Sequence, residues 1–219
     1  MLSSILQQKG DVPKILVSLA HVPGSGNPDS AKVVQLFQQR GLNILSIPLD
    51  FDTIKNRAIV RSQRLRETTA DWMLFADSDM AYDQLFFSDL CKKLQTERYN
   101  KETLAIGADR HSLQNEFCID YFAKENVQYP LVIDNVADKV SKWPVKWVSR
   151  GSTVAGYFQL ANMKSVRERK VVYSSRPRDL WRQTKSDREF RIHMGGRTSI
   201  DTLPMYHLNH DRMGAEVQR

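Results

Sequence analysis

Hydrophobic and polar residues follow two different periods along the first half of the chain. Runs rich in strand-forming residues lie at 14–20, 42–49, 72–76 and 103–108. Between these runs, apolar residues recur every three or four positions, which is typical of amphipathic helices. The predicted helices cover residues 31–40, 53–69 and 84–97. This alternation predicts an α/β fold with a mostly parallel central sheet that is flanked by helices on both faces.

The second half of the chain has a less regular pattern. Residues 118–122 and 131–135 have the composition of strands, and residues 148–160 look extended. The pattern then favours helices at 161–170 and 187–194, a basic connection at 176–187, and a final strand at 198–208. Residues 1–12 are predicted to be a polar lead-in. No repeat or low-complexity tract divides the chain, so we expect a single domain over residues 1–219.

The strand predicted at 72–76 is followed at once by two carboxylates. Asp77, Ser78 and Asp79 stand at its carboxyl end, which is the edge where ligands bind in open α/β sheets. Neighbouring carboxylates repel one another unless a cation lies between them, and their oxygens suit Mg²⁺ or Mn²⁺. The same triplet also makes a good turn or helix N-cap. The sequence therefore indicates either a metal site or a structural turn at this position.

Composition places the chain among ordinary globular proteins. It has 219 residues, of which 41% are hydrophobic and 26% are charged. No apolar run approaches the ~20 residues of a membrane span, and residues 1–10 lack the pattern of a signal peptide. Cys91 and Cys118 are the only cysteines and do not have metal-ligand spacing. We therefore expect no transmembrane segment, no zinc site and no disulfide framework, and a cytoplasmic location.

The net charge of +7 points to anionic partners. Nucleotides, anionic glycans, nucleic acid and acidic lipid headgroups are the candidates. Basic residues gather at 57–66 and 167–197, where a pair of solvated helix faces is the favoured explanation for each individual arginine. No zinc-finger, RNP or helix-turn-helix signature accompanies them, and the loop at 21–28 lacks the Gly-Lys-Ser/Thr of a Walker P-loop.

Several motifs, taken in order over residues 14–211, resemble the GT-A class of nucleotide-sugar glycosyltransferases, in particular its family-2-like members. The matching stretches are Val17-Ser18-Leu19-Ala20-His21, Asn56-Arg57, Phe75-Ala76-Asp77-Ser78-Asp79-Met80, Gly156-Tyr157-Phe158-Gln159-Leu160, Ser186-Asp187-Arg188-Glu189-Phe190 and Tyr206-His207-Leu208-Asn209-His210. The resemblance implies a GT-A, Rossmann-like fold, in which residues 1–110 bind the nucleotide sugar and residues 111–219 form the acceptor side.

The resemblance also implies a reaction and a set of roles. A sugar would pass from a nucleoside-diphosphate donor, with a UDP-sugar expected first, to a hydroxyl acceptor, with inversion. The implied donor-binding residues are Ala20, His21, Asn56, Arg57, Arg61, Asp77 and Ser78. The implied ligands of Mn²⁺ or Mg²⁺ are Asp77, Asp79, His207 and His210. The implied catalytic base is Asp187 or Glu189, and Asp187 is favoured.

Some assignments stay open at the level of residues. His207 and His210 point to opposite faces if the final strand continues, so one of them is expected to be the ligand, and His207 is favoured. Trp143, Trp147 and Tyr157 could stack on a sugar, although isolated aromatic residues more often belong to the core.

Two other functions remain as alternatives. One is a nucleotidyltransferase, although the loop at 21–28 lacks the expected Gly-rich phosphate-binding signature. The other is a basic α/β module that binds nucleic acid or an anionic glycan without catalysis, with steep salt dependence and no need for Mn²⁺. An intermediate possibility is a glycosyltransferase whose acceptor is itself anionic, a polysaccharide or nucleic acid, held by the basic segment 167–197.

Overall fold

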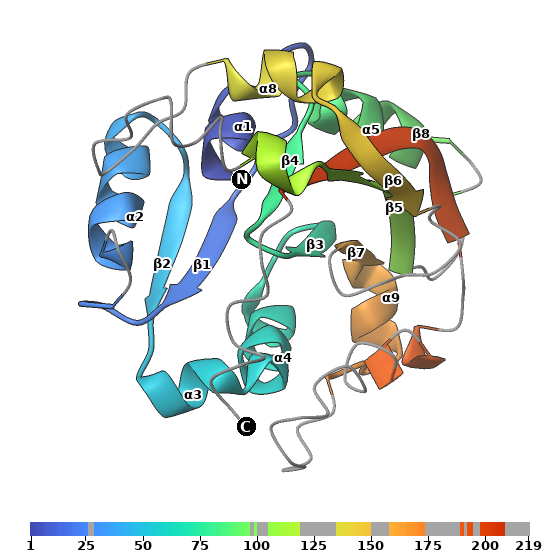
Figure 1. Cartoon of the computed structure of the whole chain (residues 1–219). Coiled ribbons are helices and arrows are strands. Elements are labelled where there is room, and N and C mark those ends of the chain that lie inside the picture. Colours follow the sequence, from blue (N-terminus) through green and yellow to red (C-terminus); the bar gives the residue numbers. More distant parts are fainter. Residues whose placement is uncertain are drawn as a thin grey trace, which may run out of the picture.

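The structure of the chain is a computed structural model with a mixed α/β architecture (Figure 1). It describes residues 1–25, 29–96, 99, 105–118, 135–149, 158–173, 189–190, 192–194 and 198–208. The helical elements are α1 (Leu2–Leu6), α2 (Ser30–Gln39), α3 (Phe51–Lys55), α4 (Arg57–Glu67), α5 (Phe86–Leu94), α8 (Val136–Lys139), the 3₁₀ helix η1 (Val140–Lys142) and α9 (Met163–Glu168). The strands are β1 (Val17–His21), β2 (Ile44–Pro48), β3 (Trp72–Ala76), β4 (Met80–Tyr82), β5 (Ala105–Leu113), β6 (Val145–Ser149), β7 (Phe158–Asn162) and β8 (Thr198–His207).

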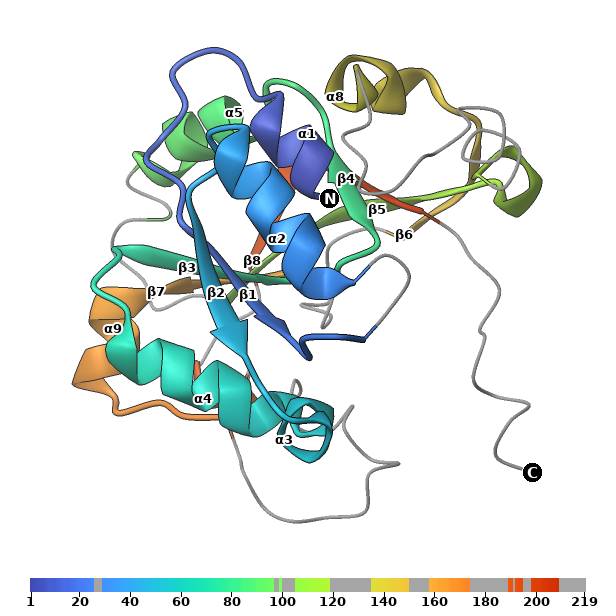
Figure 2. The same ribbon diagram turned by 90° about the vertical axis from the view of Figure 1, so that its left-hand side faces the viewer.

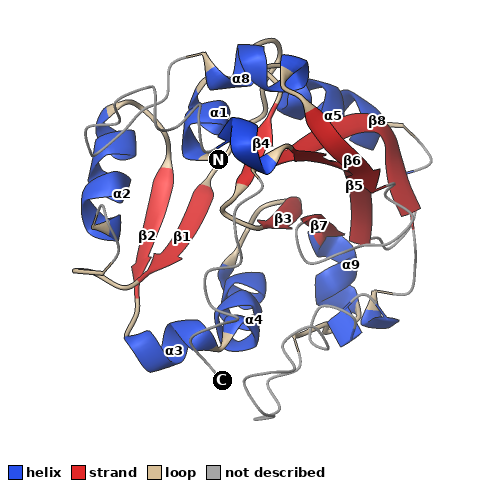
Figure 3. Cartoon of the chain, viewed as in Figure 1, coloured by secondary structure: helices blue, strands red, loops and turns tan. Residues whose placement is uncertain are grey.

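The described strands form two sheets. β1 and β2 make a parallel pair, and a second sheet has the order β3-β7-β5-β8-β4, with β6 paired to β5 (Figure 3). Within the second sheet, the β5–β8 pairing is parallel and the other described pairings are antiparallel. The α/β class is confirmed, but the expectation of a mostly parallel sheet is wrong. Buried strands have the same apolar pattern in either direction, so the pattern could not reveal that β7 runs against both of its neighbours.

Several elements of the first half agree with the sequence pattern. The strand at 72–76 has the bounds predicted for it, and α2 begins where Asp29 accepts a hydrogen bond from the backbone N–H of Ala31. The helix expected at 53–69 is instead broken in two. Asn56 leaves the helical conformation, with φ −94° and ψ 76°, and its side chain accepts from the N–H of Ile59 at 3.3 Å. Asparagine therefore ends α3 and caps α4.

The polar lead-in expected at residues 1–12 is also a wrong prediction. Residues 2–6 form α1, in which Ser3, Ser4 and Ile5 are buried. The Ser4 hydroxyl donates to the Met1 carbonyl at 2.7 Å and accepts from the backbone N–H of Tyr82 in β4 at 3.2 Å. In both Figure 1 and Figure 2 the start of the chain lies beside β4. Ser4 is a polar residue in sequence, but its hydroxyl is hydrogen-bonded inside the fold.

The second half is described in part. Of the strand expected at 118–122, the structure describes Cys118, which is helical, and of the strand at 131–135 it describes Asn135. The extended stretch at 148–160 appears as the end of β6 and the start of β7, with residues 150–157 outside the described part. α9 and β8 confirm the predicted helix at 161–170 and the predicted final strand. The expected connection at 176–187 lies outside the described residues.

Three groups of buried side chains hold these elements together. The first joins α5, β4 and β8 to α2 and β2 through residues such as Phe86, Met80 and Phe37. The second joins α4, β3, β7 and α9, and it includes Phe75, Tyr173 and Phe190. The third lies between α8 and the opposite side of β4, β5 and β8. β3 contributes to the first two groups, so its end at Ala76 is anchored from both of its faces.

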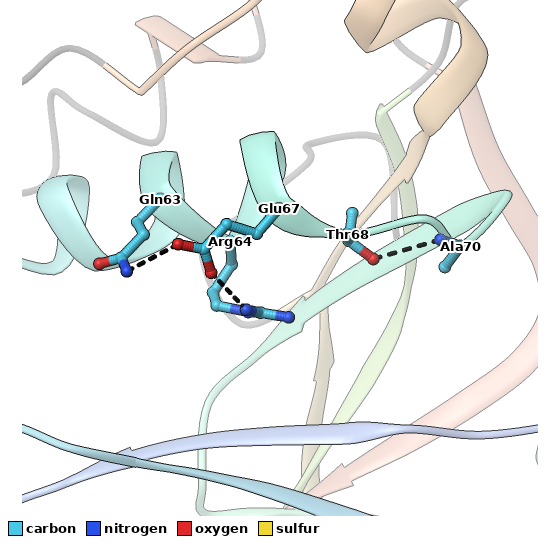
Figure 4. A network of polar contacts seen from close by, with 5 residues as sticks. All are labelled: Gln63, Arg64, Glu67, Thr68 and Ala70. Atoms are coloured by element: carbon cyan, nitrogen blue, oxygen red, sulfur yellow. Dashed lines mark hydrogen bonds and ion pairs between the residues drawn. The ribbon is translucent and has the colours of Figure 1, made fainter.

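The turn that leads from α4 into β3 is held by polar contacts (Figure 4). Glu67 accepts from Gln63 at 2.8 Å and from Arg64 at 2.6 Å, and the N–H of Ala70 donates to the Thr68 hydroxyl at 3.3 Å. From α9, Arg167 donates to the carbonyls of Thr68 and Ala70, both at 3.1 Å. These bonds fix the point at which the chain enters β3.

Candidate active site

The structure brings together one carboxylate of the Asp-Ser-Asp triplet and one histidine of the last strand. Nε2 of His207 lies 3.1 Å from Oδ2 of Asp79, although the two residues are 128 positions apart in sequence. The side chains are 18% and 25% exposed, respectively, so both can be reached from solvent. The expected pairing of a triplet carboxylate with His207 is thus present in the fold.

Backbone bonds set this geometry. β4 begins directly after Asp79 and pairs antiparallel with β8, so that Met80 stands opposite His207. The N–H of Leu208 donates to the Asp79 carbonyl at 2.8 Å, and the N–H of Met80 donates to the Asp77 carbonyl at 3.4 Å. The triplet is therefore a tight turn between β3 and β4, and the strand pairing holds its last carboxylate against His207. The structural-turn and metal-site interpretations are compatible.

Both carboxylates of the triplet act on the same buried hydroxyl. Burial raises the pKa of Tyr82, and the charges of Asp77 and Asp79 raise it further. Asp79 also faces the start of α1: burial lowers the pKa of the Met1 α-amino group to about 6, and the Asp79 carboxylate opposes this shift. The two aspartates therefore lie at one end of β4, in a setting where negative charge is concentrated.

The Asp79–His207 pair brings together one carboxylate and one imidazole. A carboxylate oxygen and an imidazole nitrogen are donors that Mn²⁺ accepts. Within the described part of the chain, no group of three or more histidine, cysteine or acidic side chains has the arrangement of a metal site. His210 and Asp187 lie outside the described residues. The fold therefore supports two donors, Asp79 and His207, with Asp77 next to them, and ligation itself stays a prediction.

The candidate donor-binding residues of α4 have defined surroundings. Asn56 caps the helix, and Arg57 is its first residue. The guanidinium of Arg61 lies 5.3 Å from the ring centre of Phe75 and 5.4 Å from that of Tyr173, and its Nη1 donates to the Tyr173 hydroxyl at 3.4 Å. The structure thus places Arg61 against aromatic rings beside β3. A role for Asn56, Arg57 or Arg61 toward a diphosphate stays a prediction.

The candidates at the end of β1 differ in how their side chains are used. His21 is buried, with Nδ1 3.1 Å from the Ser30 hydroxyl and Nε2 2.9 Å from the Ser46 hydroxyl. Both ring nitrogens are thus engaged by α2 and β2, which is the ordinary role of a core histidine. Ala20 precedes it in β1, and Ser78 is exposed in the turn before β4. Nucleotide binding by Ala20, His21 or Ser78 stays a prediction.

Glu189, one of the two candidate bases, directly precedes Phe190, whose ring packs against Phe75 of β3. Phe190 is fully buried and stacks on Tyr173, with ring centres 4.3 Å apart and planes at 6°. It also meets Phe75 edge-on, with ring centres 5.9 Å apart. Phe75 is two residues before Asp77, so the helical turn that carries Glu189 is packed beside the strand that leads into the triplet.

Tyr173 and Gln159 have a role that was not predicted from the sequence. The Tyr173 hydroxyl donates to Oε1 of Gln159, which is fully buried in β7 and stands opposite Phe75. The Tyr173 carbonyl accepts from the Ser62 hydroxyl of α4 at 2.9 Å. A glutamine inside the strand Phe158–Asn162 was the available signal, because a buried amide needs partners.

Comparisons with known proteins show a similarity in fold. No protein-family model and no curated protein sequence matches the chain. Among solved structures, a crystal structure of residues 1–349 of S. aureus TarS matches with a TM-score of 0.61 and 12% identity, over 94% of this chain and 55% of that one. A crystal structure of S. aureus TarS also matches, with a TM-score of 0.61 and 12% identity, over 95% of this chain and 34% of that one.

The chain thus spans about half of the shorter TarS structure and a third of the longer one. No helix within the described residues is long and apolar enough to cross a membrane. At 12% identity, this likeness concerns the fold alone. Over nearly its whole length, this chain has a fold similar to that of S. aureus TarS.

Proposed function

We propose that this chain is a metal-dependent glycosyltransferase, which moves a sugar from a nucleoside-diphosphate donor to a hydroxyl acceptor with inversion. The observation that carries the proposal is the contact between Asp79 and His207 at 3.1 Å, at the end of the turn that follows β3. The likeness in fold to TarS, which is a glycosyltransferase, supports the same function for this chain. A UDP-sugar is the donor proposed first.

Asp79 and His207 would hold Mn²⁺ or Mg²⁺, with Asp77 beside them. Once bound there, the ion would neutralise the diphosphate that becomes the leaving group. The β4–β8 pairing holds these two side chains in place before any ligand arrives, because Met80 and His207 are opposite each other in the ladder. A site that is formed in advance loses less free energy to ordering when it binds.

A carboxylate must also take a proton from the acceptor. An alcohol is a poor nucleophile at neutral pH, so a base receives its proton as the oxygen bonds to the anomeric carbon and the bond to the diphosphate breaks. We propose Asp187 for this role, with Glu189 as the alternative. The packing of Phe190 on Phe75 and Tyr173 supports a place for the neighbouring Glu189 beside β3.

The test is a thermal-shift panel with UDP, GDP, CDP and dTDP, each with and without Mn²⁺. A ligand that binds the folded state raises the melting temperature, and the stabilisation grows with the logarithm of the ligand concentration relative to Kd. We expect a shift with one nucleotide that requires Mn²⁺, and hydrolysis of the matching nucleotide sugar. If no nucleotide shifts the melting temperature, the proposal fails. Binding to anionic polymers with steep salt dependence would then favour the non-catalytic module.

A further inference from the structure

The structure separates the two tryptophans of the segment that enters β6. Trp143 is 7% exposed and packs against Phe117, with ring centres 5.4 Å apart, in the group of buried side chains under α8. Trp147, four residues later and within β6, is 43% exposed. Trp143 is therefore a core residue, and Trp147 presents an indole to solvent.

The strand register places Trp147 on the same sheet face as the candidate metal pair. Trp147 in β6 is opposite Ser112 in β5, and Ser112 is opposite His207 in β8. Residues in register on neighbouring strands point to the same face, and strands are ~4.8 Å apart, so Trp147 and His207 are separated by ~10 Å. A short oligosaccharide spans this distance.

Arg110 holds the indole in a defined position. Its guanidinium carbon lies 4.7 Å from the centre of the Trp147 ring. Arg110 is two residues before Ser112 in β5, so both side chains share the face on which Trp147 and His207 lie. Stacking of this kind stabilises the ring orientation, because the cation is attracted to the π face. An exposed aromatic ring that is already ordered loses little entropy when a ligand stacks on it.

We propose that Trp147, oriented by Arg110, is a stacking platform for a sugar ring of the acceptor glycan. This proposal rests on the proposed glycosyltransferase function. One face of a pyranose ring carries C–H groups, and such an apolar face packs well on the electron-rich face of an indole. Trp147 lies two strands from His207, on the same face of the sheet. This position suits contact with a sugar ring of the acceptor other than the ring that carries the reacting hydroxyl.

The adjacent residue provides a matched control. Val148 is 49% exposed, similar to Trp147, but it is opposite His111 on the other face of the sheet. The His111 ring packs on Tyr206, with ring centres 5.5 Å apart, which marks that other face. The test variants are therefore Trp147→Thr, which suits a strand but removes the ring, Trp147→Tyr, which restores an aromatic face, and Val148→Thr.

Saturation-transfer NMR tests the platform without relying on catalysis. The probes are chitotetraose, maltotetraose and a hyaluronan tetrasaccharide at millimolar concentration, with the wild-type chain and each variant. We expect saturation of the ring protons of at least one probe with the wild type and Val148→Thr, loss with Trp147→Thr, and recovery with Trp147→Tyr. Equal saturation with Trp147→Thr, or none with any probe on the wild type, would overturn the proposal.

A second measurement separates this proposal from the proposed function. The shift in melting temperature with nucleotide and Mn²⁺ should be the same in Trp147→Thr and the wild type, since the ring lies away from Asp79 and His207. Trp147→Thr should raise the KM for an acceptor sugar about tenfold. If the wild type shows no nucleotide shift, the glycosyltransferase function fails. If the shift is present but the acceptor KM is unchanged, the platform alone fails.

Discussion

The rings of Tyr173 and Phe190 are stacked, with centres 4.3 Å apart and planes at 6°. Tyr173 meets Phe75 of β3 edge-on at 5.2 Å between ring centres, and its hydroxyl donates to Gln159 of β7. Phe190 directly follows Glu189. The stack thus connects the segment of the candidate base to the two strands beside the Asp-Ser-Asp turn. Its loss should disturb catalysis more than donor binding.

Replacing Tyr173 tests this connection. Tyr173→Phe keeps the stack and removes the hydrogen bond to Gln159, so we expect a stability loss of about 1–3 kcal/mol and a nearly unchanged kcat. Tyr173→Leu removes the stack, and we expect kcat to fall with little change in donor KM. Phe37→Leu, buried in another part of the core, is the control for general destabilisation. Equal loss of kcat in Phe37→Leu would show that the effect is not specific to the stack.

Removing the charge of Asp79 should weaken metal-dependent nucleotide binding and leave the fold intact. Asp79→Asn keeps the size of the side chain beside His207, so the cost in unfolding free energy should be below about 1 kcal/mol. The Mn²⁺ concentration needed for a nucleotide-dependent shift should rise about tenfold or more. Asp89→Asn, whose exposed carboxylate pairs with Lys92 on α5, is the control. If Asp79→Asn unfolds the chain, the Asp79 carboxylate serves the stability of the turn, and its proposed role as a metal ligand fails.

The two histidines near the end of the chain should differ in their effect. We expect His207→Ala to lower the affinity for Mn²⁺, because its imidazole already lies against Asp79. His210→Ala is expected to leave that affinity unchanged. Manganese titration followed by electron paramagnetic resonance measures both. A loss with His210→Ala alone would move the ligand assignment to His210.

Conservative changes at the two candidate bases separate their roles. Asp187→Asn should lower kcat by about 10²–10⁴-fold with donor affinity nearly unchanged, since a general base acts in the chemical step. Glu189→Gln should have a smaller effect on kcat. Steady-state rates and nucleotide titrations on the two variants provide the comparison. Weaker donor binding in Asp187→Asn would argue for a donor-binding role, and a larger fall of kcat in Glu189→Gln would exchange the assignments.

The contact between α1 and β4 should contribute to stability. Ser4→Ala removes the hydroxyl that accepts from the N–H of Tyr82 at 3.2 Å within the core. A buried donor that loses its acceptor costs about 1–3 kcal/mol, so the urea midpoint should fall with an unchanged slope. Ser25→Ala, at a half-buried loop position, serves as the reference substitution. An unchanged midpoint in Ser4→Ala would mean that α1 adds little to the stability of β4.

The sequence alone determined the features that depend on near neighbours in the chain. The strand at 72–76, the turn carboxylates after it, and the capped start of α2 follow from local propensity, turn chemistry and capping, which act over a few residues. The resemblance to GT-A glycosyltransferases placed Asp79 and His207 among the metal ligands, and the fold brings these two side chains together.

The tertiary structure alone decided what depends on distant partners. Strand direction in the second sheet and the burial of Ser4 follow from pairing and packing across the chain. Trp143 and Trp147 show the same point in one segment. The residue type and the apolar setting are alike, yet one ring is covered from the α8 side and the other is exposed on the sheet face that carries His207. Which face a side chain occupies depends on the register with neighbouring strands, and register is a non-local property.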